Sequence, residues 1–403
     1  MQAVLLIGGR GSRLGSLAKT RPKPLLEVAG RPFVQHLIYN LRRFGFDRFL
    51  LLAGHLSAVV EELVGPNTPF ARGLAAELTI VAEPDVMGTG GALAFAEAHL
   101  AETFLLLNGD SLFDFNVLDL TIAPGADWLG RVALCRMPDA RRYGLVALEG
   151  GRITRFLDKP TEATPGIING GVYWLKRDLV SRITNHPCSL ESEIFPALAT
   201  EGRLDGVVYE GLFIDIDIPD DLARADRELA SKFVRPAVFL DRDGTLNHDT
   251  GYTHRIQDFR WIDGVPQLIK RLNDAGVFVF VVSNQAGIAR GYYEPPAVER
   301  LHRWMMADLV RIGAHVDDFR FCPHHPEGSI ADYSRPCLCR KPMPGMINDL
   351  LARWSVDRNR SVMIGDKATD AAAGRNAGIE GVTVPAGGLA DPIETFLNGL
   401  PQA

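Results

Sequence analysis

Val238-Phe239-Leu240-Asp241-Arg242-Asp243-Gly244-Thr245 decides the fold of the second half of this chain. Three apolar residues predict a buried strand, and two carboxylates at positions i and i+2 follow where that strand ends. An isolated Asp-x-Asp is also common in surface turns. Two later apolar runs of this chain are also followed by polar segments, which are Ser283-Asn284-Gln285 and Gly365-Asp366-Lys367. The repeated arrangement predicts a layered α/β domain with an active site at the strand ends.

The composition predicts two globular domains. The chain has 403 residues, more than the roughly 250 to 300 that one core supports. Lys and Arg form no runs and the net charge is −6, so we expect no nucleic acid partner. Residues 1–7 lack a basic leader and run into a glycine loop, and no apolar run approaches the ~20 residues that span a bilayer. We therefore expect a cytoplasmic protein that acts on small molecules and has no membrane partner; its oligomeric state stays open.

Apolar runs alternate with segments of helical periodicity along the chain, which is typical of α/β domains. Residues 128–157 contain turn signals between β-rich pieces, so this part of the first sheet is predicted to be mixed or antiparallel. Pro236 cannot continue a helix, which predicts a domain of residues 1–230, a linker of residues 231–236 and a domain of residues 237–403. The expected strands are 3–7, 48–52, 78–82, 104–107, 238–240, 277–282 and 361–364, and the expected helices are 32–44, 57–64, 90–100, 220–230, 265–275, 296–311, 344–354 and 369–377.

A glycine-rich turn follows the first expected strand, in Leu6-Ile7-Gly8-Gly9-Arg10-Gly11-Ser12-Arg13-Leu14. Glycines let backbone N–H groups approach phosphate oxygens that a Cβ would keep away. A tight strand-to-helix turn would need glycines as well. Arg13 and the segment Arg21-Pro22-Lys23-Pro24-Leu25 favour phosphate binding, because they add cations beside the loop, where a triphosphate needs charge compensation.

The stretch from Leu6 to Pro32 resembles the signature of the sugar-phosphate nucleotidyltransferases, and the resemblance extends over residues 1–230. It implies a Rossmann-like domain with a mixed sheet in which a sugar 1-phosphate attacks the α-phosphorus of a nucleoside triphosphate and releases pyrophosphate. Catalysis would rest on positioning and on charge neutralisation by Mg²⁺, Lys23, Arg13 and Lys159. The implied nucleotide-binding residues are Gly8, Gly9, Gly11, Arg13, Lys23, Glu83, Gly88, Thr89 and Gly90.

The same resemblance implies a sugar-phosphate site and a Mg²⁺ site. Asn169-Gly170-Gly171-Val172-Tyr173 resembles the sugar-binding turn of the family. Asp158 stands where the family usually has Glu, and its side chain is one methylene shorter. Asp217 stands where the family has Gly, and this replacement implies a rearranged loop or a further ligand. The implied substrate-binding residues are Asp110, Lys159, Asn169, Gly170 and Glu191, and the implied Mg²⁺ ligands are Asp110 and Asp215.

The two carboxylates after Leu240 can reach the same phosphorus atom. Asp241 would attack to form an aspartyl-phosphate, and Asp243 would protonate the leaving oxygen and later activate water. Attack by an anion on an anion needs positive charge, for which Lys341 and Mg²⁺ are candidates. We expect Asp366 to share the Mg²⁺ with Asp241 and the backbone carbonyl of Asp243. With Ser283 and Lys341 in the catalytic set, this pattern resembles the haloacid dehalogenase-type phosphatases and implies their Rossmannoid fold.

Three cysteines and a histidine gather in the loop before Lys341. Cys322, His324, Cys337 and Cys339 form a full tetrahedral set for a structural Zn²⁺. Buried free cysteines are the alternative. With no open coordination position, the metal would staple the loop and hold Arg340 and Lys341 over the phosphate.

The zinc loop narrows the second resemblance. Together with Asp249-Thr250-Gly251-Tyr252 and the segment from Ser283 to Gly291, it resembles the D-glycero-D-manno-heptose 1,7-bisphosphate 7-phosphatases over residues 236 to about 390. Histidinol-phosphate phosphatases have a similar zinc loop, so the substrate stays open between the two. The implied substrate-binding residues are Asp249, Gly251, Tyr252, Asn284, Gln285, Arg340 and Lys367.

The two resemblances fit consecutive reactions. Removal of the 7-phosphate leaves a heptose 1-phosphate, which is the acceptor class of a nucleotidyltransferase. We therefore expect a bifunctional enzyme whose first domain resembles D-glycero-α-D-manno-heptose 1-phosphate guanylyltransferases and makes GDP-heptose from GTP. The alternatives are a histidinol-phosphate-type phosphatase fused to a transferase for another sugar 1-phosphate or another nucleotide, and a chain in which one half only binds.

Overall fold

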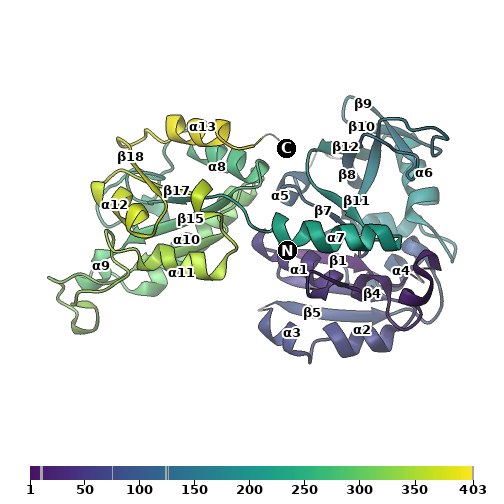
Figure 1. Cartoon of the computed structure of the whole chain (residues 1–403), viewed down its shortest axis with the longest axis horizontal. Coiled ribbons are helices and arrows are strands. Elements are labelled where there is room, and N and C mark those ends of the chain that lie inside the picture. The colour runs from purple at the N-terminus through teal and green to yellow at the C-terminus, as the bar shows by residue number, and fades with distance from the viewer. Residues whose placement is uncertain (10–11, 75, 123–124, 126, 402–403) are drawn as a thin grey trace. The chain divides into compact units, whose positions relative to one another are not determined.

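The computed structural model describes residues 1–9, 12–74, 76–122, 125 and 127–401. The chain divides into two compact units, Met1–Ser231 and the residues from Lys232 onward. Each unit has its own sheet (Figure 1). Each unit also has its own apolar core. Helix α7 (Pro219–Lys232) ends the first unit, so the first two residues of the predicted linker are still helical.

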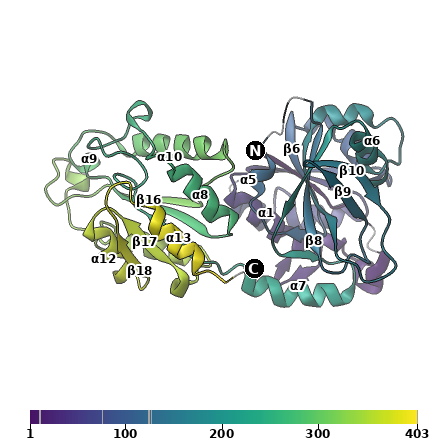
Figure 2. The same cartoon turned by 90° about the horizontal axis from the view of Figure 1, so that it is seen from above.

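The first unit is built on a nine-stranded mixed sheet with the order β5-β4-β1-β6-β11-β8-β12-β10-β9. The strands from β5 to β6 are parallel, whereas β11 is antiparallel to both of its neighbours, β6 and β8. The sheet is therefore mixed, as the turn signals predict, and Figure 2 shows its strands fanning out. The bounds are β1 Gln2–Leu6, β4 Arg48–Ala53, β5 Glu77–Ala82, β6 Thr103–Asn108, β8 Gly130–Met137, β9 Leu145–Glu149, β10 Arg152–Leu157, β11 Gly166–Lys176 and β12 Leu204–Tyr209.

Short elements at the rim of this sheet position the site. β13 (Phe213–Asp215) pairs antiparallel with β7 (Ser111–Phe113), with Asp215 opposite Ser111. This pairing brings Asp215 next to Asp110, although about a hundred residues separate them in the sequence. The remaining elements are the strand pair β2 Glu27–Val28 and β3 Arg31–Pro32 and the helices α1 Phe33–Arg43, α2 Ser57–Val64, α3 Pro69–Gly73, α4 Gly88–Phe95, α5 Val117–Leu120 and α6 Phe195–Thr200.

The prediction of a turn at residues 169–173 is wrong, because these residues lie inside β11. The register of β11 against β8 shifts between Asn169 and Val172, so the two glycines form a bulge, which re-aims side chains without ending the strand. Gly171 has φ +71°, and a Cβ on Gly170 would lie 2.6 Å from the ring of Phe113. The glycines thus serve a bulge and a close approach to β7.

The second unit is a five-stranded parallel sheet with the order β16-β15-β14-β17-β18. Alternate residues of β14 face two different cores. Val238 and Leu240 pack with α8, α10 and α13, whereas Ala237 and Phe239 pack with α11 and α12, so helices cover both faces, as Figures 1 and 2 show. The bounds are β14 Ala237–Leu240, α8 Val265–Asp274, β15 Phe278–Asn284, α9 Ala286–Ala289, α10 Pro295–Val310, β16 Asp318–Cys322, α11 Gly345–Arg353, β17 Val362–Gly365, α12 Ala368–Asn376, β18 Glu380–Thr383 and α13 Ala390–Asn398.

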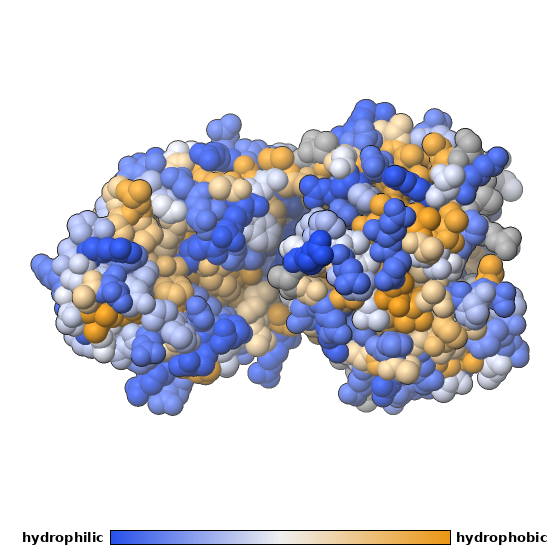
Figure 3. Space-filling view, turned by 90° about the horizontal axis from the view of Figure 1, so that it is seen from below, coloured by the Kyte–Doolittle hydropathy of each residue, from blue (hydrophilic) through white to orange (hydrophobic). Residues whose placement is uncertain are grey.

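Apolar side chains are concentrated inside both units. On the face shown in Figure 3, hydrophobic residues form small groups between hydrophilic ones. Among the described residues, no helix combines the length and the apolar character that a bilayer crossing requires.

Candidate active sites

A cavity of about 600 Å³ lies at the carboxyl ends of the parallel strands of the first unit. Each strand contributes residues just after its last position, because the carboxyl ends of parallel strands meet at one edge of a sheet. Gly8 follows β1, Glu83 follows β5 and Asp110 follows β6. The predicted nucleotide residues that line this cavity are Gly8, Gly9, Lys23, Glu83, Gly88 and Thr89.

Gly8 is required by a close approach of two loops. A Cβ on Gly8 would lie 2.9 Å from the backbone nitrogen of Gly54 and 3.0 Å from Oε1 of Glu83. Burial raises the pKa of the Glu83 carboxyl, although the backbone N–H of Met87 donates to it at 3.4 Å. Gly11 lies outside the described residues, and so does the side chain of Arg13.

Lys23 is the buried cation of this cavity. Its ammonium lies 2.8 Å from Oδ2 of Asp110 and 3.6 Å from Oδ1 of Asp215, and it also pairs with Asp217. Burial alone lowers the pKa of Lys23, but Asp110 and the other two carboxylates raise it above its ordinary value. Burial raises the pKa of Asp215 to about 6 against the opposing effect of Lys23. Three carboxylates thus surround one ammonium, and they carry more negative charge than Lys23 neutralises.

A second cavity of about 470 Å³ shares Asn108, Glu191 and Asp217 with the first. Lys159 is exposed and lines it, as does Asn169. Arg142 also lines it and forms an ion pair of 2.7 Å with Asp221 in α7. Arg142 and Asp221 are not predicted from the sequence, because their approach depends on a tertiary contact that no local pattern encodes.

Hydrogen bonds join the walls of the two cavities around Glu191. Thr89 donates its hydroxyl to Oε2 of Glu191 at 2.7 Å. Asn169 donates to the hydroxyl of Tyr173 at 2.9 Å, and that hydroxyl lies 3.5 Å from Oε1 of Glu191. Residues predicted to bind the nucleotide and the sugar therefore belong to one network. Gly90 is in the first turn of α4 and donates its N–H to the carbonyl of Cys188, while Gly170 packs against Phe113.

The second unit holds a compact, buried charge cluster at the carboxyl ends of β14, β15 and β17. The Lys341 ammonium donates to Oδ1 of Asp241 at 2.5 Å and to the carbonyl of Val282 at 2.7 Å, and it lies 2.7 Å from Oδ1 of Asp370. Burial raises the pKa of Asp241 to about 6, against the opposing effect of Lys341. Burial lowers the pKa of Lys341, but the two carboxylates raise it above its ordinary value.

Asp370 is the residue of this cluster that the sequence analysis missed. It lies four residues after Asp366, in the first turn of α12, and its Oδ2 accepts from the N–H of Lys367 at 2.9 Å. Oxygens of Asp241, Asp366 and Asp370 lie within 4.8 Å of one another. Within the described residues, Oδ1 of Asp366 is buried and lacks a hydrogen-bond partner. An unsatisfied carboxylate oxygen beside two other carboxylates fits a Mg²⁺ ligand set.

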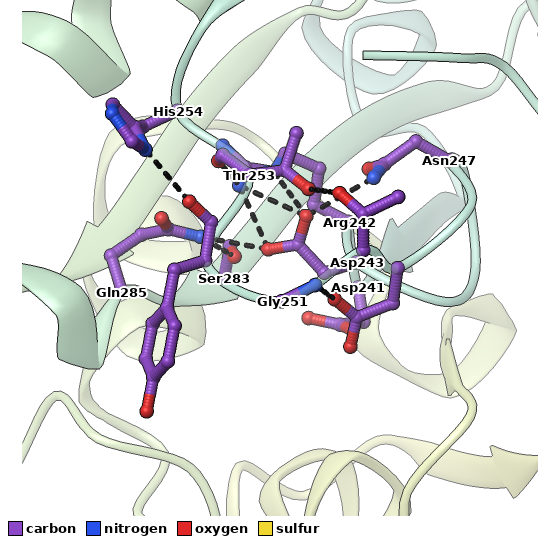
Figure 4. A network of polar contacts seen from close by, with 12 residues as sticks. Asp241, Arg242, Asp243, Asn247, Gly251, Thr253, His254, Ser283 and Gln285 are labelled. Atoms are coloured by element: carbon purple, nitrogen blue, oxygen red, sulfur yellow. Dashed lines mark hydrogen bonds and ion pairs between the residues drawn. The ribbon is translucent and has the colours of Figure 1, made fainter. Parts of the chain in front are cut away.

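Asp243 is held by several donors, which Figure 4 shows. Arg242 donates to both of its oxygens at 2.8 and 2.9 Å, Asn247 donates at 3.2 Å and Gln285 donates at 3.0 Å. Burial raises the pKa of Asp243, but Arg242 and the hydrogen bonds outweigh burial and lower it. Gly244, with φ +92°, leaves room for Asp366, because a Cβ there would lie 2.5 Å from Oδ2 of Asp366.

The other predicted residues of this site have different neighbours. Ser283 is buried beside Gln285, whose amide donates to its hydroxyl at 2.7 Å. Asn284 uses its amide to bind the backbone of Lys341, with contacts of 3.1 and 3.0 Å. Asp249, Gly251 and Tyr252 form an exposed loop in which Gly251 donates to Asp249. Lys367 is largely exposed, 3.9 Å from Asp366.

The predicted zinc ligands come together. The sulfur atoms of Cys322, Cys337 and Cys339 are 3.1 to 3.5 Å apart, and Nδ1 of His324 lies 3.3 Å from Cys339 and 3.7 Å from Cys322. Four ligands about 2.3 Å from one ion would be about 3.8 Å apart, so the cluster has nearly the size of a zinc site. The interaction with Cys322, followed by those with Cys337 and His324, lowers the pKa of Cys339 to about 5. Arg340 donates to the carbonyl of His324 at 3.1 Å, which ties it to this cluster.

The folds and sites define an α/β nucleotidyltransferase joined to a phosphatase of the haloacid dehalogenase type. The nucleotidyl transferase family model matches residues 2–232, and the HAD-hydrolase-like model matches residues 338–394. A D-glycero-beta-D-manno-heptose-1,7-bisphosphate 7-phosphatase of Rhodopseudomonas palustris is 49% identical over 147 residues, which are 36% of this chain and 82% of that protein. A D-glycero-alpha-D-manno-heptose-1,7-bisphosphate 7-phosphatase of Photorhabdus laumondii is 41% identical over 142 residues, 35% of this chain and 78% of that protein.

A solved structure resembles the first unit. HddC from Yersinia pseudotuberculosis, complexed with GMP-PN, superposes with a TM-score of 0.50 and 25% identity over 57% of this chain and 99% of that one. The chain belongs to the nucleotidyl transferase family through its first unit and to the family of these phosphatases through its second. It is a bifunctional enzyme with a nucleotidyltransferase and a phosphatase, as the sequence predicts.

Proposed function

We propose that the chain converts D-glycero-D-manno-heptose 1,7-bisphosphate into GDP-heptose in two steps. The carrying observation is the fusion itself, because a unit related to heptose-1,7-bisphosphate 7-phosphatases is joined to a nucleotidyltransferase. Loss of the 7-phosphate yields a heptose 1-phosphate, and a sugar 1-phosphate is the acceptor that such a transferase needs. The GMP-PN in the related HddC structure supports GTP as the nucleotide.

In the phosphatase site, Asp241 attacks the phosphorus of the 7-phosphate, and the bond from phosphorus to the sugar oxygen breaks. Asp243, which has to be protonated when the substrate is bound, gives its proton to the leaving oxygen. Water then attacks the aspartyl-phosphate, Asp243 takes up a proton from it, and phosphate leaves. Lys341 lies against the nucleophile and offsets the charge of the phosphoryl group, and Asp370 and the carbonyl of Val282 fix its position.

Mg²⁺ fits this site. The unsatisfied oxygen of Asp366, with Asp241 and the backbone carbonyl of Asp243, would hold the ion. When bound, Mg²⁺ neutralises phosphate charge and orients the phosphoryl group. The cluster of three thiols and His324 fits a structural Zn²⁺, which would hold Arg340 and Lys341 in register with the site.

In the transferase site, the first cavity would take the nucleotide and the second would take the sugar phosphate. Lys23 would bind the triphosphate, and Lys159 would bind the phosphate of the sugar, where Glu191 and Asn169 can accept or donate hydrogen bonds to hydroxyl groups. The carboxylates of Asp110, Asp215 and Asp217 exceed the charge of Lys23, which supports a Mg²⁺ beside them. That ion would supply the charge neutralisation that phosphoryl transfer requires.

The proposal is tested by incubating the purified chain with GTP, Mg²⁺ and each anomer of heptose 1,7-bisphosphate. We expect one anomer to give GDP-heptose with one phosphate and one pyrophosphate per product. Both anomers are needed because the phosphatase relatives carry both names. If neither anomer loses phosphate, or if heptose 1-phosphate supplied directly accepts no nucleotide, the proposed function is wrong.

A further inference from the structure

A buried amide in the phosphatase site makes hydrogen bonds in three directions. Nε2 of Gln285 donates to Oδ2 of Asp243 at 3.0 Å and to the hydroxyl of Ser283 at 2.7 Å. Its Oε1 accepts from the hydroxyl of Tyr293 at 2.8 Å. In its ionised form, which is the form that takes up a proton from water, Asp243 only accepts, so the NH₂ end of the amide faces it. The Tyr293 hydroxyl, at the opposite end, stabilises that orientation.

Two contacts fix the ring of Tyr293. The ring stacks on His254 with centroids 4.3 Å apart and planes 15° apart. On the other side it lies against Gly287, where a Cβ would come within 2.3 Å of the ring and 2.7 Å of the hydroxyl oxygen. Burial raises the pKa of Tyr293, so its hydroxyl stays protonated and able to donate. The absence of a side chain at position 287 therefore lets the hydroxyl reach Gln285.

We propose that Tyr293 is a positioning residue of the phosphatase, whose hydroxyl orients the Gln285 amide and thereby holds the carboxylate of Asp243 for proton transfer to the leaving oxygen. The inference rests on the proposed role of Asp243 as general acid. Arg242 and Asn247 hold Asp243 from its own segment of chain, whereas Gln285 follows β15. Through Gln285, Tyr293 thus connects the segment that follows β15 to Asp243, which follows β14.

Two substrates with different leaving groups distinguish a loss of acid positioning from general structural damage. A primary alkoxide needs a proton as it leaves, whereas p-nitrophenolate leaves without one, so only the first depends strongly on a general acid. The ratio kcat/KM covers the steps up to release of the leaving group. For Tyr293→Phe, which keeps the stacked ring, we expect kcat/KM for heptose 1,7-bisphosphate to fall about ten-fold, and that for p-nitrophenyl phosphate no more than about three-fold.

The control is Tyr292→Phe. Tyr292 is exposed, lies next in the sequence and packs edge-on against Tyr252, with ring centroids 4.9 Å apart, and we expect both ratios to stay unchanged. Gly287→Ala, which displaces the Tyr293 ring without removing its hydroxyl, should reproduce the selective loss. In a Gln285→Leu background, Tyr293→Phe should have no further effect, because its partner is gone.

Equal losses on both esters in Tyr293→Phe, or a ten-fold loss that persists in the Gln285→Leu background, would overturn the inference. Asp243→Asn separates this failure from a failure of the assigned acid. If Asp243→Asn is selective for the alkyl ester and Tyr293→Phe is not, only the role of Tyr293 is wrong. If Asp243→Asn affects both esters equally, the acid itself is wrongly assigned. If heptose bisphosphate is not a substrate, another primary alkyl phosphate replaces it and the comparison still holds.

Discussion

The two active sites place a buried lysine among carboxylates in different ways. Lys341 lies in a tight cluster in which Asp241 is the proposed nucleophile and Asp370 a support. Lys23 lies at the wall of an open cavity of about 600 Å³ that continues into another of about 470 Å³. The first arrangement suits a small phosphoryl group that is transferred to the protein. The second arrangement suits two large substrates. In the proposed reaction one substrate attacks the other, and neither forms a covalent bond to the protein.

The largest effect that this comparison predicts is on Asp241. Replacing Asp241 by Asn removes the carboxylate that would form the acyl-phosphate, so we expect phosphate release to fall at least about a thousand-fold. Nucleotide transfer to supplied heptose 1-phosphate should keep its wild-type rate. Phosphate and pyrophosphate release, assayed separately on the same preparation, measure the two effects. Wild-type phosphate release by Asp241→Asn would contradict the covalent route.

The corresponding change in the first unit should have a smaller effect, because Lys23 binds and neutralises without forming a bond. For Lys23→Met we expect a loss of about a hundred-fold to a thousand-fold in pyrophosphate release, with the phosphatase unaffected. Lys19→Met, an exposed lysine nearby, is the matched control and should retain activity. If both variants lose the same activity, Lys23 has no special role in the transfer.

Removal of a proposed zinc ligand tests whether the phosphatase site depends on the cluster of cysteines and His324. Cys337→Ser should abolish bound zinc and lower phosphatase activity about ten- to a hundred-fold, because Arg340 and Lys341 follow the last ligand and lose their fixed position. Elemental analysis and phosphate release measure the two effects. Cys135→Ser, in the other unit, should keep the zinc. Full zinc content in Cys337→Ser would refute the assignment.

The predictability of the two sites from the sequence differs for a physical reason. In the phosphatase, Asp241 and Asp366 directly follow apolar strands and Ser283 lies at the end of one, and a parallel sheet brings such positions together. Asp370 can be predicted from the same pattern, because it lies in the first turn of the helix that follows Asp366. In the transferase, Lys23 and Asp217 meet across 194 positions, and Arg142 reaches Asp221 in α7. Such contacts depend on the completed fold.

The same physical reason explains which strands the sequence predicts. The prediction found the central strands β1, β4, β6, β14, β15 and β17, because central parallel strands are continuous apolar runs. It also found the edge strand β5, whose sequence ELTIVA keeps several apolar residues. β16 and β18 are the two edge strands of the second sheet, and their sequences, DFRFC and EGVT, mix charged and apolar residues. Both of these strands are partly exposed, and neither has a continuous apolar run. Helix α13 was missed as well, although its apolar Ile393 and Phe396 have helical spacing.

The smallest expected effect is a pH dependence of stability that has opposite signs in the two units. His302 is buried and stacked on Phe319, and burial, followed by repulsion from Arg242, lowers its pKa to about 3. Above pH 6.5 the imidazole is neutral in the folded and unfolded states and contributes no pH dependence. Below that pH, only the unfolded state takes up the proton, so stability is lost as the pH falls. From pH 8 to pH 5 this group should destabilise the second unit by about 2 kcal/mol.

Asp215 in the first unit should act in the opposite direction. Burial raises its pKa to about 6, so in the metal-free protein the folded state takes up the proton first, and the same pH change should stabilise that unit by about 1 kcal/mol. Hydrogen exchange of the amides in β14 and β15, and separately in β1 and β6, measures each unit within the full chain. The matched variants are His302→Phe, which keeps the stacked ring, and Asp215→Asn. Each substitution should reduce the pH dependence of the stability of its own unit only. If the pH dependence persists in both variants, other groups are responsible for it.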